Sequence, residues 1–286
     1  MADSVASAGP GGAPLRLFYF DGFANFGDRI AHDIVSAVSG RPVVASPPGE
    51  ADLFALGSIL RQVAKATKQP RAGVKPAVWG SGIMGLQGPE VRVDNIHFAA
   101  VRGPLTQALL DLGPIALGDP GLLITDVVAP VPRGDRIGVL CHVSDKPAPE
   151  TLERLRADGR FDMIAVGTED HLATVRAIAA CGHVVSSSLH GLIVADAYGV
   201  PNTWMVNSRI HTGGAFKFHD YALSVRRLLN VPVLLEDLPG LADAGAFGTA
   251  TPAHFDQVQA LKDPLRAAFP HDHLRAPAAA EQKQVA

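Results

Sequence analysis

The chain has 286 residues and a formal net charge of −3, with 47% hydrophobic and 19% charged residues. This length suits two globular domains of middling size, and the slightly acidic balance argues against a broad nucleic-acid-binding face. Cys141 and Cys181 lie in apolar runs, so we expect two reduced core cysteines of a cytoplasmic protein and no disulfide framework.

Residues 1–14, MADSVASAGPGGAP, contain neither a basic segment nor an apolar one. We expect them to form a disordered tail and not a signal peptide. No apolar run in the sequence approaches the length of a membrane span, so any contact with the inner face of a membrane would be peripheral.

The first predicted strand, residues 15–20, runs into a polar loop and then into an amphipathic helix that ends near residue 38. Asn25, Gly27 and Asp28 lie on this loop, at the carboxyl end of the strand. Two interpretations stay open: the loop contacts a ligand at that end of the sheet, or it consists of turn formers in which Asp28 caps the helix.

Three short apolar strands follow, at residues 42–45, 52–56 and 76–79. Gly80–Gly85 then matches the G-x-G-x-x-G pattern of dinucleotide-binding loops. Pro89 follows too soon for a helix of useful length, and no acidic residue closes a strand about 20 residues later, so NAD binding is rejected. We expect Gly80, Ser81 and Gly82 to let the backbone come close to a ligand or to a neighbouring loop.

A strand at 96–101 ends in Arg102, and Pro104 suits the first turn of the helix that follows. Because Arg102 stands at a strand end, we expect its guanidinium to face the cleft, where arginine binds carboxylate or phosphate in bidentate fashion. A surface salt bridge is the alternative. A short strand at 115–117 and a turn at 118–122 complete this half.

Residues 129–135, with two prolines and a glycine, are the best linker candidate. The alternation of strands and helices starts afresh after them, with His142 near the end of the first strand. Lys217 follows a loop that holds Arg209. Strands are predicted at 136–143, 162–166, 183–186, 203–206 and 231–235, and helices at 149–157, 169–180, from 190, at 219–229 and at 252–268.

The segment 183–207, HVVSSSLHGLIVADAYGVPNTWMVN, is the stretch around which the chain is organised. A strand gives way to a helix at the elbow Ser187, Ser188 and Leu189, and the helix opens at His190. A helix N-terminus has free N–H groups and positive dipole character, and it suits an anionic ligand. The serines could instead only cap the helix, but an imidazole at the same elbow favours a functional site.

Alternating strands and helices predict an α/β fold with parallel sheets. We expect two Rossmann-like domains, residues 15–130 and 135–250, whose strand ends and loops face one shared cleft. A helix within 251–270 is expected to brace the domains, and residues 271–286 to form a second disordered tail. Closure of the two domains would follow ligand binding.

Several motifs stand in the order of a known family: FANFGD early in the chain, then VWGSG, AVRGPLT, GDPGLL and finally SSSLHGLIVADAYGVP at the elbow. From about Phe20 to Tyr221, the chain resembles the polysaccharide pyruvyl transferases. The nearest resemblance is to the bacterial ketal pyruvate transferases of xanthan and succinoglycan synthesis.

The resemblance implies a glycosyltransferase-B-like pair of domains that transfers pyruvate from phosphoenolpyruvate to two hydroxyls of one sugar, forming a cyclic ketal and releasing phosphate. It implies a saccharide acceptor, in an exopolysaccharide or its polyprenyl-linked precursor, and neither a metal nor an organic cofactor. In the family, the donor contacts an arginine, a leucine and a histidine of the elbow and a lysine further on. Here Leu189, His190 and Lys217 match those contacts.

The resemblance also leaves the donor site one cation short. Ser188 stands at the position of the elbow arginine, as in the xanthan-type branch, and Ala215 replaces an arginine of the xanthan and succinoglycan enzymes. We expect the elbow serines, Ser187 and Ser188, to contact the donor. The residues that could supply the missing charge are Arg102, Arg209 and His211.

Phosphoenolpyruvate carries a carboxylate and a phosphate, so its site needs positive groups at two ends. Arg102 from the first domain, and Lys217 with the helix N-terminus from the second, would supply them. We expect His190, as an imidazolium, to protonate the methylene carbon of the donor. His142 or Asp28 would accept the proton of the attacking hydroxyl, with His142 preferred. The cleft loops expected to meet the acceptor carry Asn25, Asp28, Gly80, Ser81, Gly82 and His142.

Two other functions stay open. A nucleotide-sugar glycosyltransferase of similar shape could hold a diphosphate at the elbow, although no acidic residue is placed for the ribose. A non-catalytic anion- or sugar-binding homologue would fit the departures at Ser188 and Ala215. The Cys, His, Asp and Glu residues show no metal-ligand spacing.

Overall fold

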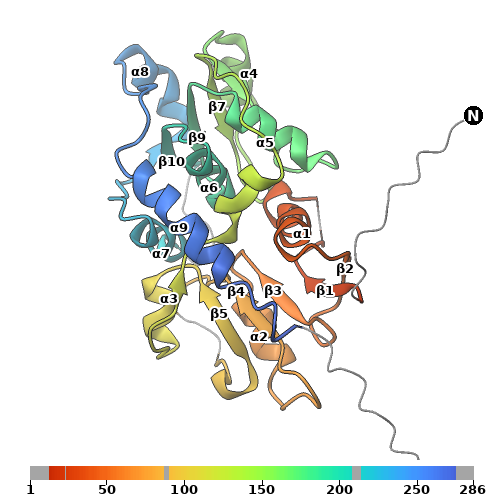
Figure 1. The fold of residues 1–286 in the computed structure, drawn as a ribbon. Helices are drawn as coiled ribbons and strands as arrows, with labels where there is room; N and C mark the ends of the chain where they lie inside the picture. The colour runs from red at the N-terminus through yellow and green to blue at the C-terminus, as the bar shows by residue number, and fades with distance from the viewer. Residues whose placement is uncertain (1–12, 23, 87–89, 208–213, 275–286) are drawn as a thin grey trace, which may run out of the picture.

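The computed structural model describes residues 13–22, 24–86, 90–207 and 214–274. Two β-sheets, one of six strands and one of five, stack end to end with helices around them (Figure 1). Every strand pairing in both sheets is parallel. The protein is therefore an α/β protein consistent with two Rossmann-like domains, which confirms the fold class predicted from the alternation of elements.

The first half contains the six-stranded sheet, in the order β2-β1-β3-β4-β5-β6. Its elements are β1 (Leu15–Phe18), α1 (Phe26–Ser39), β2 (Val43–Ala45), β3 (Leu53–Ala55), α2 (Leu60–Ala66), β4 (Ala77–Trp79), η1 (Val93–Asn95), β5 (His97–Val101), α3 (Pro104–Leu109), β6 (Ala116–Leu117) and the 3₁₀ segment η2 (Pro120–Asp126).

The second half contains the five-stranded sheet, in the order β11-β10-β9-β7-β8. Its elements are β7 (Ile137–Leu140), α4 (Pro149–Ala157), β8 (Phe161–Met163), α5 (His171–Ala179), β9 (His183–Ser186), α6 (Leu189–Ala197), β10 (Asn202–Val206), α7 (Phe216–Ser224), β11 (Val233–Leu234), η3 (Leu235–Asp237), α8 (Leu238–Asp243) and α9 (Phe255–Ala267).

Both sheets repeat the same strand order. In the first, β1 lies between β2 and β3, and in the second, β7 lies between β8 and β9. The chain therefore leaves the first strand of each half for one side of the sheet and returns on the other, which creates a topological switch point. In open parallel sheets, ligands bind in the crevice at the carboxyl ends of the strands beside such a point.

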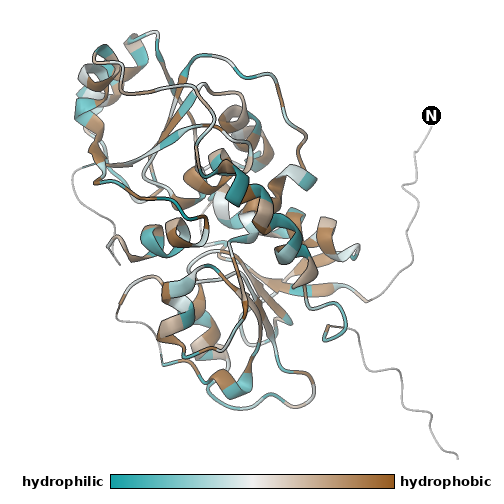
Figure 2. Ribbon diagram, turned by 60° about the vertical axis from the view of Figure 1, so that its left-hand side comes forward, coloured by the Kyte–Doolittle hydropathy of each residue, from teal (hydrophilic) through white to brown (hydrophobic). Residues whose placement is uncertain are grey.

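Local sequence explains the helix that follows β1. Asn25 caps α1, since its side-chain oxygen accepts a hydrogen bond of 3.3 Å from the amide of Gly27. Gly40, with φ 65°, ends the helix in the left-handed conformation. Between these caps, Ile30 and Ile34 face the core and are fully buried. Figure 2 shows the same division across the molecule, with hydrophobic residues along the strands and hydrophilic ones on outer helix faces and loops.

Helix α6 is enclosed by other elements, because all nine of its residues are buried. It packs against η2 from the first half and against α5, α9, β9 and β10 from the second. A helix enclosed on every side is hydrophobic all round, and this enclosure places the elbow before α6 at the centre of the molecule.

One continuous hydrophobic core joins the two halves. It runs from Phe26 on α1 through Leu123 on η2 to Ile193 on α6, and these three side chains are almost completely buried. The expected closure of the two domains on a ligand stays a prediction, and it would have to proceed around this shared core.

Helix α9 crosses back to the first half and lies across both sheets (Figure 1). Trp79 of β4 donates a 2.9 Å hydrogen bond to the carbonyl of Leu265. Lys262 donates to the hydroxyl of Thr125 in the first half at 3.0 Å, and to the carbonyl of Ala197 in the second at 3.1 Å. These bonds tie the last helix to both halves.

Several element boundaries differ from those predicted. Lys217 was expected at the end of a loop but lies in the first turn of α7, which begins at Phe216. The same helix was expected to continue to residue 229 but ends at Ser224, and Arg226 takes a positive φ of 54°. Within the residues that the structure covers, no helix combines the length and apolar character that crossing a bilayer requires.

Candidate functional site

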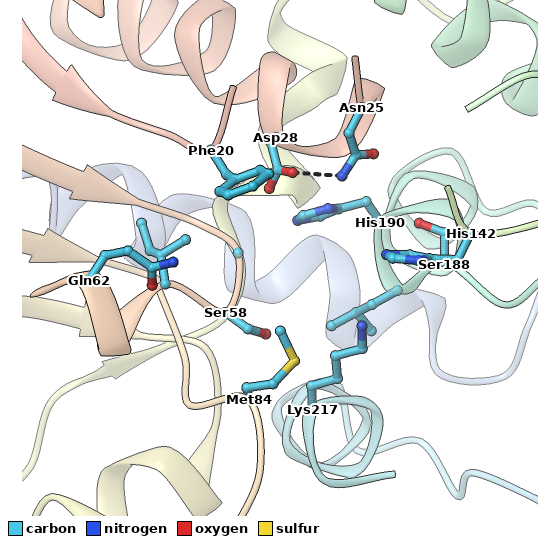
Figure 3. A pocket seen from close by; sticks show the side chains of 13 residues that line it. Phe20, Asn25, Asp28, Ser58, Gln62, Met84, His142, Ser188, His190 and Lys217 are labelled. Atoms are coloured by element: carbon cyan, nitrogen blue, oxygen red, sulfur yellow. Dashed lines mark hydrogen bonds between the residues drawn. The ribbon is translucent and has the colours of Figure 1, made fainter. Parts of the chain in front are cut away.

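A cavity of about 230 Å³ lies where the switch points of the two sheets meet (Figure 3). The loops after β1 and β3 form one side of it, and the loops after β7 and β9 form the other. The lining residues of the first half are Phe20, Asn25, Asp28, Gly57, Ser58, Ile59, Gln62 and Met84, and those of the second half are His142, Ser188, Leu189, His190 and Lys217. The cavity therefore occupies the position where this topology places ligands.

Asp28 lies in the first turn of α1 and faces the cavity from the first half (Figure 3). The side-chain amide of Asn25 donates a 2.6 Å hydrogen bond to its carboxylate. Burial raises the pKa of Asp28 to about 6, although the Asn25 hydrogen bond and the charge of Lys217 both act to lower it. A carboxyl group with this pKa can exchange a proton near neutral pH.

His190 is the second residue of α6, and its side chain crosses the cavity toward α1 (Figure 3). Its Nε2 atom is buried and has no hydrogen-bond partner among the residues that the structure describes. Burial, followed by the charges of Lys217 and Arg102, lowers the pKa of His190 to about 3. The ring is therefore neutral at neutral pH in the protein without ligand, so His190 holds no extra proton there, whereas an imidazolium was expected. A neutral ring at Nε2 can donate or accept one hydrogen bond.

Lys217 enters the cavity from α7 and is only 5% exposed. Its ammonium group lies 5.2 Å from the centre of the Phe218 ring and makes no hydrogen bond to a described side chain. Burial, followed by the charge of Arg102, lowers the pKa of Lys217 to about 8, while Asp28 and Asp145 act to raise it. The group is still mostly protonated at neutral pH, so it presents a buried positive charge without an anionic hydrogen-bond partner in the described residues.

The elbow serines differ in what they contact. Ser188 is the N-cap residue of α6 and lines the cavity with Leu189. The hydroxyl of Ser187 instead donates a 2.5 Å hydrogen bond to Asp145 and accepts one of 2.9 Å from the amide of His142. Ser187 therefore holds the loop that follows β7 and does not line the cavity; its predicted contact with the donor stays a prediction.

This arrangement keeps His142 at the cavity wall. Its amide also donates a 3.0 Å hydrogen bond to Asp145, and its Nδ1 atom lies 2.8 Å from the hydroxyl of Ser144. The predicted strand-end histidine thus borders the same cavity as His190 and Lys217.

Arg102 does not face the cavity. It is fully buried and forms an ion pair of 3.0 Å with Asp220 of α7. Its remaining donors reach the hydroxyl of Ser58 at 2.7 Å and the carbonyl of Ile83 at 2.6 Å. The prediction that its guanidinium faces the cleft and binds the anionic donor is wrong, because Asp220 of α7 already neutralises its charge. The sequence alone could not place α7 opposite Arg102.

The glycine-rich loop after β4 is also structural. A Cβ atom added to Gly82 would stand 2.3 Å from the Arg102 guanidinium carbon, and one added to Gly80 would stand 2.0 Å from Pro120. The hydroxyl of Ser81 donates to the carbonyl of Leu56 at 3.0 Å. Gly80, Ser81 and Gly82 therefore let a neighbouring loop and a buried arginine come close, and none of the three lines the cavity that the acceptor was expected to enter.

Arg209 and His211, two of the predicted site residues, lie outside the residues that the structure describes.

Several residues that line the cavity were not predicted from the sequence. These residues follow the strands β1, β3 or β4 in the chain: Phe20, Gly57, Ser58, Ile59, Gln62 and Met84. The strand order would have revealed most of them, because the loop after β3 always borders a switch point between β1 and β3. Order in a sheet is not a property of any single stretch of sequence.

The described part of the chain contains no group of three or more His, Cys, Asp and Glu side chains arranged to hold a metal ion. Cys141 and Cys181 are both free thiols. The titratable groups among the described lining residues are instead one ammonium group, one carboxyl group and two imidazoles, and the N-terminus of α6 lies beside them. Such a set can bind an anion and move a proton.

Comparison with known proteins names no family. No protein-family model matches the chain. Over 130 residues it is 33% identical to an uncharacterized protein of Acanthamoeba polyphaga mimivirus, an alignment that covers 42% of this chain and 45% of the viral protein. The match thus spans less than half the length of that curated relative. A solved structure of an uncharacterized protein from Klebsiella pneumoniae is similar with a TM-score of 0.42 and 9% identity, over 77% of this chain and 93% of that one.

Proposed function

We propose that this protein transfers pyruvate from phosphoenolpyruvate to two hydroxyls of one sugar, forming a cyclic ketal and releasing phosphate. One observation carries the proposal. Lys217 and His190, whose Nε2 atom has no hydrogen-bond partner among the described residues, both line a small cavity at the N-terminus of α6 that also holds a carboxyl group with a raised pKa. The family resemblance of the sequence adds the identity of the donor.

The second-half wall supplies the anion-binding end of the site. A buried ammonium group attracts phosphate or carboxylate strongly because little water screens it. The first amides of α6, at Leu189 and His190, belong to a helix N-terminus and favour the same negative charge. Lys217 is therefore assigned to anchor the donor, with neutral His190 giving a hydrogen bond from Nε2. A helix N-terminus keeps such an imidazole neutral while it polarises a substrate oxygen.

The size of the cavity supports a small donor. At about 230 Å³, it lies below the range of about 300–1,000 Å³ that is common for drug-sized ligands. A nucleotide sugar carries a base, a ribose, a diphosphate and a hexose, and it would need more room. The cavity is only partly enclosed, so this comparison concerns the enclosed donor and favours phosphoenolpyruvate, while a sugar acceptor can extend beyond the cavity.

Asp28 is the group assigned to move the proton. Binding of a donor with negative charges beside it would raise the pKa of Asp28 further, since like charges disfavour its ionised form. The protonated carboxyl group would transfer its proton to the methylene carbon of the donor, which becomes a methyl group and leaves the central carbon electrophilic. The resulting carboxylate would accept the proton of the first sugar hydroxyl as its oxygen bonds to that carbon.

The second sugar hydroxyl completes the reaction. Its oxygen bonds to the same carbon, the bond from that carbon to the phosphate oxygen breaks with both electrons, and its proton leaves on the phosphate. Because the two hydroxyls belong to one sugar, ring closure is intramolecular and entropically favoured. His142 at the opposite wall is assigned to hydrogen-bond the departing phosphate or the second hydroxyl.

Phosphate release tests the proposal. The protein is incubated with phosphoenolpyruvate and with terminal mannosides, glucosides and galactosides, synthetic or polyprenyl-linked. We expect release of inorganic phosphate that requires an acceptor, with a pyruvate ketal in the product by mass spectrometry. If none of these acceptors supports release while an authentic ketal pyruvyl transferase works under the same conditions, the proposed function is wrong.

A thermal-shift series separates donor classes. Ligands that bind only the folded protein raise its melting temperature. We expect stabilisation by phosphoenolpyruvate and none by UDP-sugars, and Lys217→Met should abolish the shift while Lys65→Met, at an exposed lysine on α2, should retain it. Stabilisation by UDP-sugars alone would favour the nucleotide-sugar alternative.

A further inference from the structure

The two walls of the cavity differ in chemistry. The second-half wall carries the ammonium group, the imidazoles and the helix N-terminus. The first-half wall carries the ring of Phe20, the side chains of Ile59 and Met84, and two neutral polar groups, Ser58 and Gln62. Figure 3 shows Gln62, Ser58 and Met84 gathered across the cavity from His190 and His142. Among the described lining residues of that wall, Asp28 is the one charged side chain, so the wall offers no positive group to a phosphorylated donor.

Gln62 is incompletely satisfied in the protein alone. Its side-chain oxygen is buried and has no hydrogen-bond partner among the described residues. A buried amide oxygen without a partner costs about 1–3 kcal/mol, so such groups are rare unless a ligand or water completes them. Gln62 is positioned in the first turn of α2, directly behind the switch-point loop Gly57–Ile59. Because Gln62 lines the cavity, a small rotation of its side chain would let this oxygen accept a hydrogen bond from a ligand there.

The neighbours of Gln62 restrict what that ligand is. Phe20 offers an aromatic ring and Met84 a thioether, both of which contact C–H surfaces favourably. A carboxamide can accept from one hydroxyl and donate to the next. A sugar ring presents this combination, with an apolar face of C–H groups and an edge of hydroxyls.

We infer that Phe20, Met84 and Gln62 form the binding site for the acceptor sugar ring. The inference rests on the proposed function and deepens it, since it assigns each substrate to one wall. The ring lies between Phe20 and Met84, and Gln62 hydrogen-bonds a hydroxyl that does not react. The reacting hydroxyls point across the cavity to Asp28, which stands beside Phe20 in Figure 3.

Methyl NMR on the unaltered protein tests the location. The chain contains four methionines, so a sample labelled at the methionine methyl carbons gives few signals, and Met84→Leu assigns the one at the cavity. We expect methyl mannoside, glucoside or galactoside to shift the Met84 signal without phosphoenolpyruvate present. The signals of Met163 and Met205, which do not line the cavity, should stay in place. If no glycoside moves the Met84 signal, the inference is overturned.

A substitution tests the role of the amide. Gln62→Leu keeps the size of the side chain and removes its hydrogen bonds, and we expect glycoside affinity to fall about tenfold, the equivalent of one lost hydrogen bond of about 1.4 kcal/mol. The matched control is Gln259→Leu at an exposed glutamine of α9, which should leave glycoside affinity unchanged. Equal affinity of the Gln62→Leu protein and the unaltered protein would overturn the inference.

Donor binding separates this inference from the proposed function. Gln62→Leu should leave the thermal shift caused by phosphoenolpyruvate intact, and this retained shift also shows that the variant folds. A loss of donor binding in Gln62→Leu, with glycoside binding retained, would assign Gln62 to the donor and overturn the inference. Glycoside binding at Met84 in a protein that releases no phosphate would contradict the proposed reaction and leave the sugar site standing.

Discussion

Arg102 and Asp220 form an ion pair of 3.0 Å in which neither side chain is exposed. The pair joins the end of β5 in the first sheet to α7 in the second half. Asp220 also accepts hydrogen bonds from the amides of Leu105 and Thr106 at 2.9 and 3.0 Å, so it caps α3 from across the interface. Because Asp220 follows Lys217 by three residues on the same helix, this contact also sets where Lys217 enters the cavity.

The first prediction concerns stability. Asp220→Asn leaves the Arg102 charge buried without an anionic partner, and we expect a loss of about 3–5 kcal/mol in the free energy of unfolding. Urea denaturation measures it. Asp162→Asn removes the matching partner from the exposed pair Arg136–Asp162 and should cost less than about 1 kcal/mol. Equal losses in the two variants would mean that the buried pair does not hold the halves together.

The second prediction uses the contact between α1 and His190. A Cβ atom at Gly27 would stand 2.2 Å from Nδ1 and 2.6 Å from Cβ of His190, so Gly27→Ala must move the start of α6 and the His190 side chain away from α1. We expect phosphoenolpyruvate affinity to fall at least about tenfold. In Gly49→Ala the added atom meets nothing within 4 Å, and this variant should bind the donor normally. Calorimetric titration of both variants decides the point.

The third prediction concerns the pH dependence of donor binding. The pKa of Lys217 is lowered to about 8 by burial, so its ammonium group loses the proton as the pH rises above that value. Affinity for phosphoenolpyruvate should therefore weaken on the alkaline side of about pH 8. Lys217→Arg keeps its charge at much higher pH and should flatten the profile. An affinity in the unaltered protein that stays constant through this range would exclude Lys217 as the anchor.

The fourth prediction concerns stability in acid. The pKa of His190 is lowered from 6.5 to about 3, so the unfolded chain binds a proton at this residue before the folded protein does. Its contribution to stability is present above pH 6.5 and is lost as the pH falls toward 3, at up to about 1.4 kcal/mol per pH unit.

His190→Gln should remove that contribution. The difference in unfolding free energy between the two proteins should therefore shrink between about pH 7 and about pH 5. Asp28 and Asp119 have raised pKa values, to about 6 each, and favour the folded state as the pH falls; both residues remain in the variant, so their effect cancels in the difference. A pH-independent difference would contradict a neutral, buried His190.

The fifth prediction assigns the proton transfer. Asp28→Asn keeps the hydrogen-bonding shape beside Asn25 and removes the exchangeable proton, and we expect kcat to fall about 10²–10⁴-fold with donor affinity retained. His142→Asn should cost less if His142 only hydrogen-bonds a departing group. Single-turnover measurements of ketal formation compare the two. A larger loss at His142 than at Asp28 would restore His142 as the base that sequence analysis preferred.

Much of the fold could be predicted from the sequence, because hydrophobic periodicity is a local signal. The strand His183–Ser186 and the helix Pro149–Ala157 have the predicted bounds. The elbow before α6 and the polar loop before Asp28 also lie at strand ends as expected. Local capping chemistry, such as the Asn25 cap of α1, decides these positions without help from the rest of the chain.

Only the tertiary structure decided what each charged side chain does there. Arg102 at a strand end looked like a ligand contact, but Asp220, 118 residues later, buries its charge. His190 lies at the elbow before α6, as the sequence predicted. Its charge, however, depends on burial in the low-dielectric interior and on the charge of Lys217. Gln62 carried no signal at all until the strand order placed the loop after β3 against the cavity. Periodicity reports which face of an element is buried, whereas charge, pKa and unsatisfied hydrogen bonds depend on what distant segments bring to that face.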